Sequence, residues 1–207
     1  MAHRFKKTKI YSYGFSLTEF VVAIGIFLMV GSVLMFNYPE LNNRSSLDGV
    51  AHQIALDLRQ VQLFGTSVKE TGQGTGVFPG YGLYFSSGMT AGYILFADSV
   101  SADKRYSGSS ELVSTTNITT GETISDICAN LKRDGKIAGD PGSFCKSRGS
   151  LDAVHISFTR PNPDATITST LGGTPTAVSD VEIVMLGKRG DIKRTIVVYP
   201  TGQITVE

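Results

Sequence analysis

Residues 14–38 read GFSLTEFVVAIGIFLMVGSVLMFNY, and this stretch decides the fold. Its second part, from Phe20 to Tyr38, is a run of 19 residues without a charged side chain. As an α-helix, this run would be about 28 Å long, which is close to the thickness of the hydrocarbon core of a bilayer. The sequence therefore predicts a membrane-spanning helix or a helix that is buried on all sides.

The residues before this run are basic. Residues 1–14 contain Arg4, Lys6, Lys7 and Lys9 and no acidic residue. Because positive charge is retained on the cytoplasmic side of a membrane, this flank predicts a single-pass protein of the cytoplasmic (inner) membrane. Its N-terminus would be cytoplasmic and its C-terminal part exported.

Two alternatives to a retained span are a cleaved secretory signal peptide and a plain signal anchor. A signal peptide would have a shorter apolar region and a small-residue cleavage site, and residues 36–40 offer no A-x-A pattern. Glu19 argues against both alternatives, because a carboxylate at the start of a membrane segment is costly and usually functional.

The segment Gly14-Phe15-Ser16-Leu17-Thr18-Glu19 resembles the prepilin processing site of type IV pilins and of the pseudopilins of type II secretion. The resemblance implies that residues 1–14 are a leader, which a prepilin peptidase removes by cleavage after Gly14. The same enzyme would then methylate the new amine of Phe15. The chain would be a minor pilin or pseudopilin, a structural subunit of a filament and not an enzyme. Its partners would be other subunits, an inner-membrane assembly platform and, before assembly, membrane lipid.

Glu19 also has a physical role in such a filament. Cleavage creates an amine at Phe15, and an unpaired amine or carboxylate is strongly unfavourable within an apolar helix bundle. Pairing of Glu19 with the Phe15 amine of a neighbouring subunit would neutralise both charges and set the axial register. The alternative is that Glu19 extends to the polar surface of the membrane.

The pattern after the span changes twice, which divides the chain into 15–38 (membrane or filament-core helix), 39–75 (amphipathic helix) and 76–207 (β-rich head). Pro39 predicts a kink or break in the helix, or its end at the membrane surface. In the second helix, apolar residues recur at three- and four-residue steps, so this face should lie on a sheet. They are Leu47, Val50, Ala51, Ile54, Leu58, Val61, Phe64 and Val68.

From residue 76 the apolar period is two, which predicts strands at 76–86, 93–97, 122–127, 154–160, 165–171, 181–187, 192–199 and 203–207. The last three would form a β-meander, since only short turns separate them. The predicted class is α+β. The segments Tyr81–Phe85, Tyr93–Asp98 and Tyr199–Val206 resemble the H-type minor pseudopilins, which implies a helix packed on two small antiparallel sheets.

Cys128 and Cys145 are the two cysteines of the chain, seventeen positions apart. In an exported domain they can form a disulfide, which is worth roughly 3 kcal/mol for a loop of this length. Two free thiols are the alternative. A zinc site would need two further ligands, and no Cys/His cluster supplies them.

The overall charge argues against a strongly basic nucleic-acid binder, because 18 acidic residues nearly balance the 19 basic ones. Loss of the leader removes four basic residues and no acidic one, which leaves a net charge of −3. One basic cluster comprises Lys188, Arg189, Lys193 and Arg194. A related minor pilin subfamily binds DNA through a basic segment near its C-terminal strands. DNA uptake is therefore an alternative function, as is a major pilin, but the terminal turn Thr201–Ile204 lacks the arginine of that pattern.

No catalytic or cofactor motif is visible. The histidines outside the leader, His52 and His155, lie in no recognisable triad, and polar surface placement explains each. The segment 98–103 is rich in oxygen ligands, but Val100 and Ala102 interrupt the alternation of known calcium loops, so a solvated turn is expected. The sequence thus predicts no cofactor and no metal.

Overall fold

The computed structural model describes residues 14–67, 69–70, 76, 78–131 and 143–207, with the side chains of residues 36–39 and 143 left aside. The four basic residues of the expected leader, and Val68 of the amphipathic pattern, lie outside these residues. The chain forms two compact units, residues 1–41 and residues 42–207, which are described separately.

The N-terminal unit contains the first part of α1, a helix that runs from Leu17 to Thr66. The helix begins after Ser16, whose Oγ accepts a hydrogen bond of 3.2 Å from the backbone N–H of Glu19. This is the bond of a helix N-cap, which satisfies a donor that the first turn leaves unpaired. The helix continues through Pro39, so the prediction that it breaks or ends there is wrong. Proline removes only one backbone hydrogen bond of the helix, and the turns on both sides of it remain helical.

In the second unit, α1 supplies one face to the hydrophobic core. Its fully or almost fully buried residues are Leu47, Ala51, Ile54, Ala55, Leu58 and Val61, and Val50 and Phe64 pack against them. This stripe confirms the predicted amphipathic pattern. The helix ends at Thr66 and not near residue 75, and the Thr66 hydroxyl donates to the carbonyl of Gln62 in the last turn.

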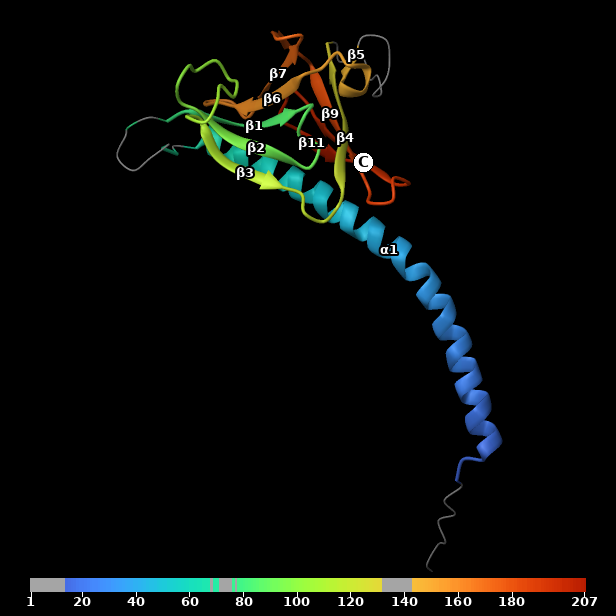
Figure 1. The fold of residues 1–207 in the computed structure, drawn as a ribbon. Helices are drawn as coiled ribbons and strands as arrows, with labels where there is room; N and C mark the ends of the chain where they lie inside the picture. Colours follow the sequence, from blue (N-terminus) through green and yellow to red (C-terminus); the bar gives the residue numbers. More distant parts are fainter. Residues whose placement is uncertain (1–13, 68, 71–75, 77, 132–142) are drawn as a thin grey trace, which may run out of the picture. The chain divides into compact units, whose positions relative to one another are not determined.

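Two antiparallel sheets complete this unit and confirm the α+β class (Figure 1). The six-stranded sheet has the order β3-β2-β1-β6-β7-β8. Its strands are β1 (Gly80–Ser86), β2 (Gly92–Asp98), β3 (Leu112–Asn117), β6 (Ala153–Phe158), β7 (Ala165–Leu171) and β8 (Thr174–Ala177).

The five-stranded sheet has the order β11-β10-β9-β4-β5. Its strands are β4 (Thr123–Asn130), β5 (Ser143–Cys145), β9 (Asp180–Leu186), β10 (Lys193–Val198) and β11 (Ile204–Val206). The last three pair antiparallel in chain order, which confirms the predicted C-terminal meander.

Three strands were not predicted, and all three lie at or beside a sheet edge. β3 is exposed along almost its whole length and β8 contains Pro175, so neither shows the alternation of a half-buried strand. β5 has only three residues, and it pairs with β4 through Cys128 and Cys145. These strands depend on their partners more than on their own side chains.

The core lies between α1 and the inward faces of both sheets. On β1 these residues are Tyr81, Leu83 and Phe85, and on β6 they are Val154, Ile156 and Phe158. The other face of β6 is buried as well, since His155 is only 5% exposed. The expectation that His155 lies on the polar surface is therefore wrong: the loop between β2 and β3 folds over that face, and a strand's own pattern cannot reveal a covering loop.

Candidate functional site

The expected processing and assembly residues lie at the start of α1. Gly14 and Phe15 precede the helix and Glu19 lies in its first turn, and the Phe15 side chain is 78% exposed. Ser16 and Glu19 have the spacing of a capping box, so a carboxylate at position 19 also suits the positive end of the helix dipole. Removal of the leader and pairing with another subunit remain predictions.

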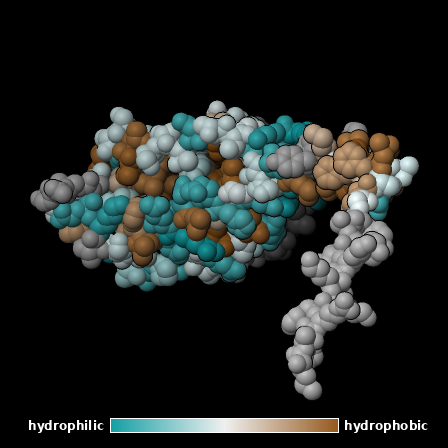
Figure 2. Space-filling view, turned by 90° about the horizontal axis from the view of Figure 1, so that it is seen from below, coloured by the Kyte–Doolittle hydropathy of each residue, from teal (hydrophilic) through white to brown (hydrophobic). Residues whose placement is uncertain are grey.

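The first part of α1 exposes an apolar surface. The helix is long and apolar enough to span a membrane, and no residue of its apolar 18-residue window is buried. Figure 2 shows hydrophobic residues (brown) on the surface of this part of the chain. Between residues 20 and 35, the large hydrophobic side chains that are more than two-fifths exposed are Phe20, Val21, Val22, Ile24, Ile26, Phe27, Leu28, Met29, Val30, Val33, Leu34 and Met35. A surface of this kind is not stable in water, so it requires lipid or other apolar helices around it.

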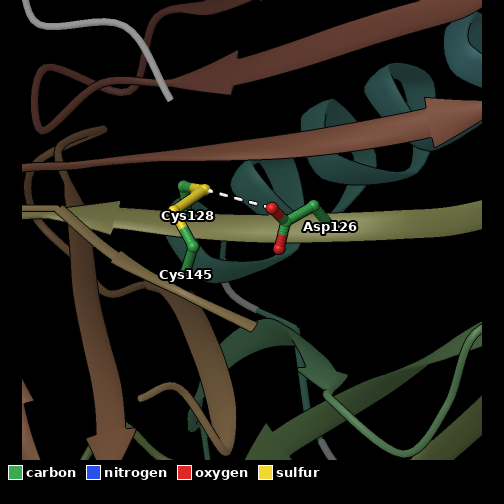
Figure 3. A group of neighbouring side chains, drawn as sticks. All are labelled: Asp126, Cys128 and Cys145. Atoms are coloured by element: carbon green, nitrogen blue, oxygen red, sulfur yellow. Dashed lines mark hydrogen bonds between the residues drawn. A yellow bond between two sulfur atoms is a disulfide. The ribbon is translucent and has the colours of Figure 1, made fainter. Parts of the chain in front are cut away.

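Cys128 and Cys145 form a disulfide between β4 and β5, as predicted (Figure 3). Both residues are buried, and Asp126 lies beside them with Oδ2 3.7 Å from the Cys128 sulfur. These three are the one group in the described part of the chain whose atoms could meet around a metal ion. Because both sulfurs are bonded to each other, no thiolate is available for a metal, and the group is structural.

Asp126 holds the segment that follows the disulfide. Its Oδ1 accepts a hydrogen bond of 2.9 Å from the backbone N–H of Ser147, and its Oδ2 accepts one of 2.6 Å from the Ser147 hydroxyl. Ser147 lies in the short helix η1 (Lys146–Arg148), directly after Cys145. The disulfide and the Asp126 carboxylate therefore both attach the segment from Cys145 to Ser147 to strand β4.

The basic cluster of the C-terminal hairpin is partly neutralised. Arg194 forms an ion pair of 2.5 Å with Asp48 of α1, and the ammonium of Lys188 lies 3.9 Å from Glu122. Arg189 and Lys193 are exposed. Only part of the predicted positive charge is thus available to a phosphate backbone.

Glu122 is fully buried at the base of this hairpin, with its Oε1 accepting a hydrogen bond of 2.5 Å from the Ser46 hydroxyl. Burial alone would raise the pKa of the Glu122 carboxyl. Hydrogen bonds from Ser46 and Thr120 and the charge of Lys188 outweigh burial, so the pKa is lowered. This charged carboxylate joins α1, the start of β4 and the hairpin. Lys188 therefore has a structural role, because its ammonium lies beside a buried charge.

Carboxylates also organise the loop over His155. Asp98 accepts a hydrogen bond of 2.8 Å from the backbone N–H of Lys104, and Glu111 accepts one of 2.7 Å from that of Ser107. Asp103 pairs with the guanidinium of Arg105 at 2.7 Å. The segment 98–103 is largely exposed, as a solvated turn would be, and these hydrogen bonds fix its backbone. Its buried residue Asp98 has a raised pKa because of burial and the nearby charges of Glu111 and Asp103.

His155 is a residue whose environment the sequence did not reveal. Its Nδ1 accepts a hydrogen bond of 3.0 Å from the backbone N–H of Tyr106. The rings of Tyr84 and Phe96 pack against the imidazole, and both of them also contact the ring of Tyr106. Burial, with a smaller contribution from the charge of Arg105, lowers the pKa of His155 to about 4. The imidazole is therefore neutral at physiological pH and forms part of a cavity lining.

Comparison of this chain with protein-family models, with curated proteins and with solved structures finds no match.

Proposed function

We propose that this chain is a structural subunit of a membrane-assembled filament, a minor pilin or pseudopilin. It is inserted in the inner membrane by the first part of α1 and processed after Gly14. Residues 42–207, which include the β-rich head, are then displayed on the outer side of the membrane. The partners are a prepilin peptidase, the assembly platform and neighbouring subunits.

The observation that carries this proposal is the position of the exposed apolar surface of α1 directly after the segment from Gly14 to Glu19. A plain membrane anchor needs the apolar surface but not the Gly-Phe junction or the carboxylate. A filament subunit needs all three: a junction for cleavage, an apolar helix for lipid and then for the filament core, and a charge that can pair with a neighbour's amine.

The disulfide supports export of the head, because disulfides persist in oxidising compartments and are rare in the cytoplasm. DNA uptake is the weaker function. Two of its four candidate contact residues, Lys188 and Arg194, already have carboxylate partners.

Processing is tested by expressing the full chain in bacterial cells with and without a prepilin peptidase, followed by mass spectrometry of the N-terminus. We expect loss of residues 1–14 and one added methyl group on Phe15, only when the peptidase is present. Gly14→Leu should block cleavage. Gly25→Leu is the matched control, because a Cβ added at Gly25 meets no atom within 4 Å. Cleavage at another position, or none, would contradict the proposal.

Assembly is tested with three variants of the first turn, scored by recovery of the chain in sheared filaments. Glu19→Ala and Glu19→Gln should be processed but not incorporated, because both remove the charge that pairs with the neighbouring amine. Ser16→Ala removes the N-cap and keeps the charge, so it should still be incorporated. Normal incorporation of Glu19→Gln would show that the charge of Glu19 has no role in assembly.

A further inference from the structure

A cavity of about 620 Å³ lies beside His155, on the face of the six-stranded sheet that is turned away from α1. Its floor comes from β1, β6 and β7, and its wall from the loop between β2 and β3. The loop residues on the wall are Arg105, Tyr106 and Ser107. Because Asp98, Asp103 and Glu111 bind the backbone of this loop, the wall is held in place before any ligand arrives.

The lining combines aromatic rings with neutral hydrogen-bonding groups. Tyr84 and Tyr106 lie with their ring centroids 5.0 Å apart, and both are half-buried. Neither phenol hydroxyl makes a hydrogen bond in the described part of the chain. Around them the cavity presents the hydroxyl-bearing residues Ser86, Ser87, Ser107 and Thr170. Such a surface offers flat apolar contact and many donors and acceptors at short range.

His155 adds a neutral donor to the floor. Because its Nδ1 accepts the Tyr106 N–H, the proton of the neutral ring lies on Nε2. That atom is 3.5 Å from the Thr170 hydroxyl, which is long for a hydrogen bond, so a ligand oxygen could replace this weak partner of Nε2–H. The lowered pKa of His155 keeps the ring uncharged above about pH 4.

The charges of the cavity disfavour an anion. Among the described residues of the lining, Arg105 alone carries a permanent positive charge, and its guanidinium is already paired with Asp103. Asp152 adds a carboxylate, of which Oδ2 accepts a hydrogen bond from the backbone N–H of Gly173. An anionic ligand would therefore meet the Asp152 carboxylate and a guanidinium that is shared with Asp103, whereas a neutral ligand rich in hydroxyls could donate to Asp152 and accept from Arg105.

The sheet topology also disfavours an extended peptide. The three strands of the floor each lie between two neighbours, so none of them offers a free edge for strand addition. We propose that this cavity binds a neutral carbohydrate: Tyr84 and Tyr106 contact the apolar face of a sugar ring, and Asp152, Arg105 and His155 bind its hydroxyls. This site would give the head a ligand and does not depend on whether the chain forms filaments.

The test uses the full chain in phospholipid nanodiscs, because glycosidic detergents would themselves occupy such a site. The probes are neutral di- and trisaccharides of glucose, galactose and N-acetylglucosamine, titrated with saturation-transfer NMR and calorimetry. We expect at least one of them to bind, and Asp152→Asn to weaken that binding about tenfold, because it removes a charge-assisted acceptor. Tyr106→Leu should weaken it as well. Asp164→Asn, at an exposed carboxylate outside the cavity, should leave it unchanged.

Three results would overturn the proposal: no neutral saccharide binds, binding is the same in Asp152→Asn as in the parent chain, or a sialylated saccharide or a Ser/Thr-rich peptide binds more tightly than every neutral saccharide. Thermal unfolding of each variant shows whether it is folded. Because Asp152 is exposed, Asp152→Asn keeps the test valid even if Tyr106→Leu does not fold.

Discussion

The backbone N–H of Tyr106 donates a hydrogen bond of 3.0 Å to Nδ1 of His155, a residue 49 positions away in the chain. This bond ties the loop between β2 and β3 to the central strand β6. It requires a lone pair on Nδ1, so it exists only while the imidazole is neutral. The fold of the loop and the protonation of His155 are therefore linked.

This linkage predicts a loss of stability in acid. The pKa of His155 is lowered to about 4 in the folded chain, whereas an unfolded histidine has a pKa near 6.5. Between these values the unfolded chain binds a proton that the folded chain does not, so the free energy of unfolding falls as the pH falls. The loss approaches about 3 kcal/mol at the lower value.

Urea unfolding between about pH 7 and pH 4.5 measures this loss. The control is His155→Asn, whose amide oxygen can still accept the Tyr106 N–H but does not titrate. Its stability should change less over the same range. An equal dependence on pH in both chains would show that His155 is not the titrating group.

Two leucines of α1 should respond differently to truncation. Leu58 is fully buried in the core, whereas Leu56 is 57% exposed. Leu58→Ala should lower the free energy of unfolding by about 2–5 kcal/mol, because it leaves a cavity, and Leu56→Ala should lower it by less than about 1 kcal/mol. Denaturant unfolding of both variants tests this. A similar loss in both would mean that Leu56 is covered by another surface in the sample.

Two glycines of the same helix form a second matched pair. A Cβ at Gly65 would overlap the carbonyl oxygen of Phe158, whereas a Cβ at Gly49 meets no atom within 4 Å. Gly49→Ala should raise stability by up to about 1 kcal/mol, since alanine is the better helix former. Gly65→Ala should lower it despite the same gain in propensity. Thermal melts of the two variants give the comparison, and a stabilised Gly65→Ala chain would contradict the close packing of α1 on β6.

Loss of the disulfide should destabilise the head. The double variant Cys128→Ser/Cys145→Ser opens a connection of 17 positions, and the free energy of unfolding should fall by roughly 3 kcal/mol. Reduction of the parent chain should produce a similar fall and should leave the double variant unchanged. An effect of reductant on the double variant would point to a cause other than this bond.

The C-terminal hairpin should not bind duplex DNA in a salt-dependent way. With Lys188 and Arg194 near Glu122 and Asp48, too few free cations remain for a multi-phosphate contact. A mobility-shift titration of the full chain at several salt concentrations tests this. A shift at moderate salt that Arg189→Ala and Lys193→Ala abolish would restore DNA binding as the function of this hairpin.

The elements with regular apolar periods were predictable. The stripe from Leu47 to Val61 was found because its buried residues recur at three- and four-residue steps. The strand at 165–171 was found because its side chains alternate between buried and half-buried positions. β3 and β8 were missed, since an edge strand is defined by hydrogen bonds to its neighbour and carries little pattern of its own. Of the alternatives predicted at Pro39, the break and the end of the helix were wrong, because the hydrogen bond that a proline removes is one of many in a helix of 50 residues.

The sequence by itself determined what depends on neighbouring residues in the chain: the apolar span, its basic flank, the segment from Gly14 to Glu19 and the period of helix and strands. The tertiary structure alone decided what depends on residues far apart in the chain. It buried His155 under a distant loop, joined Arg194 to Asp48 and formed the cavity between Tyr84 and Asp152. Burial and charge pairing are set by what lies nearby in space, and an isolated motif does not contain that information.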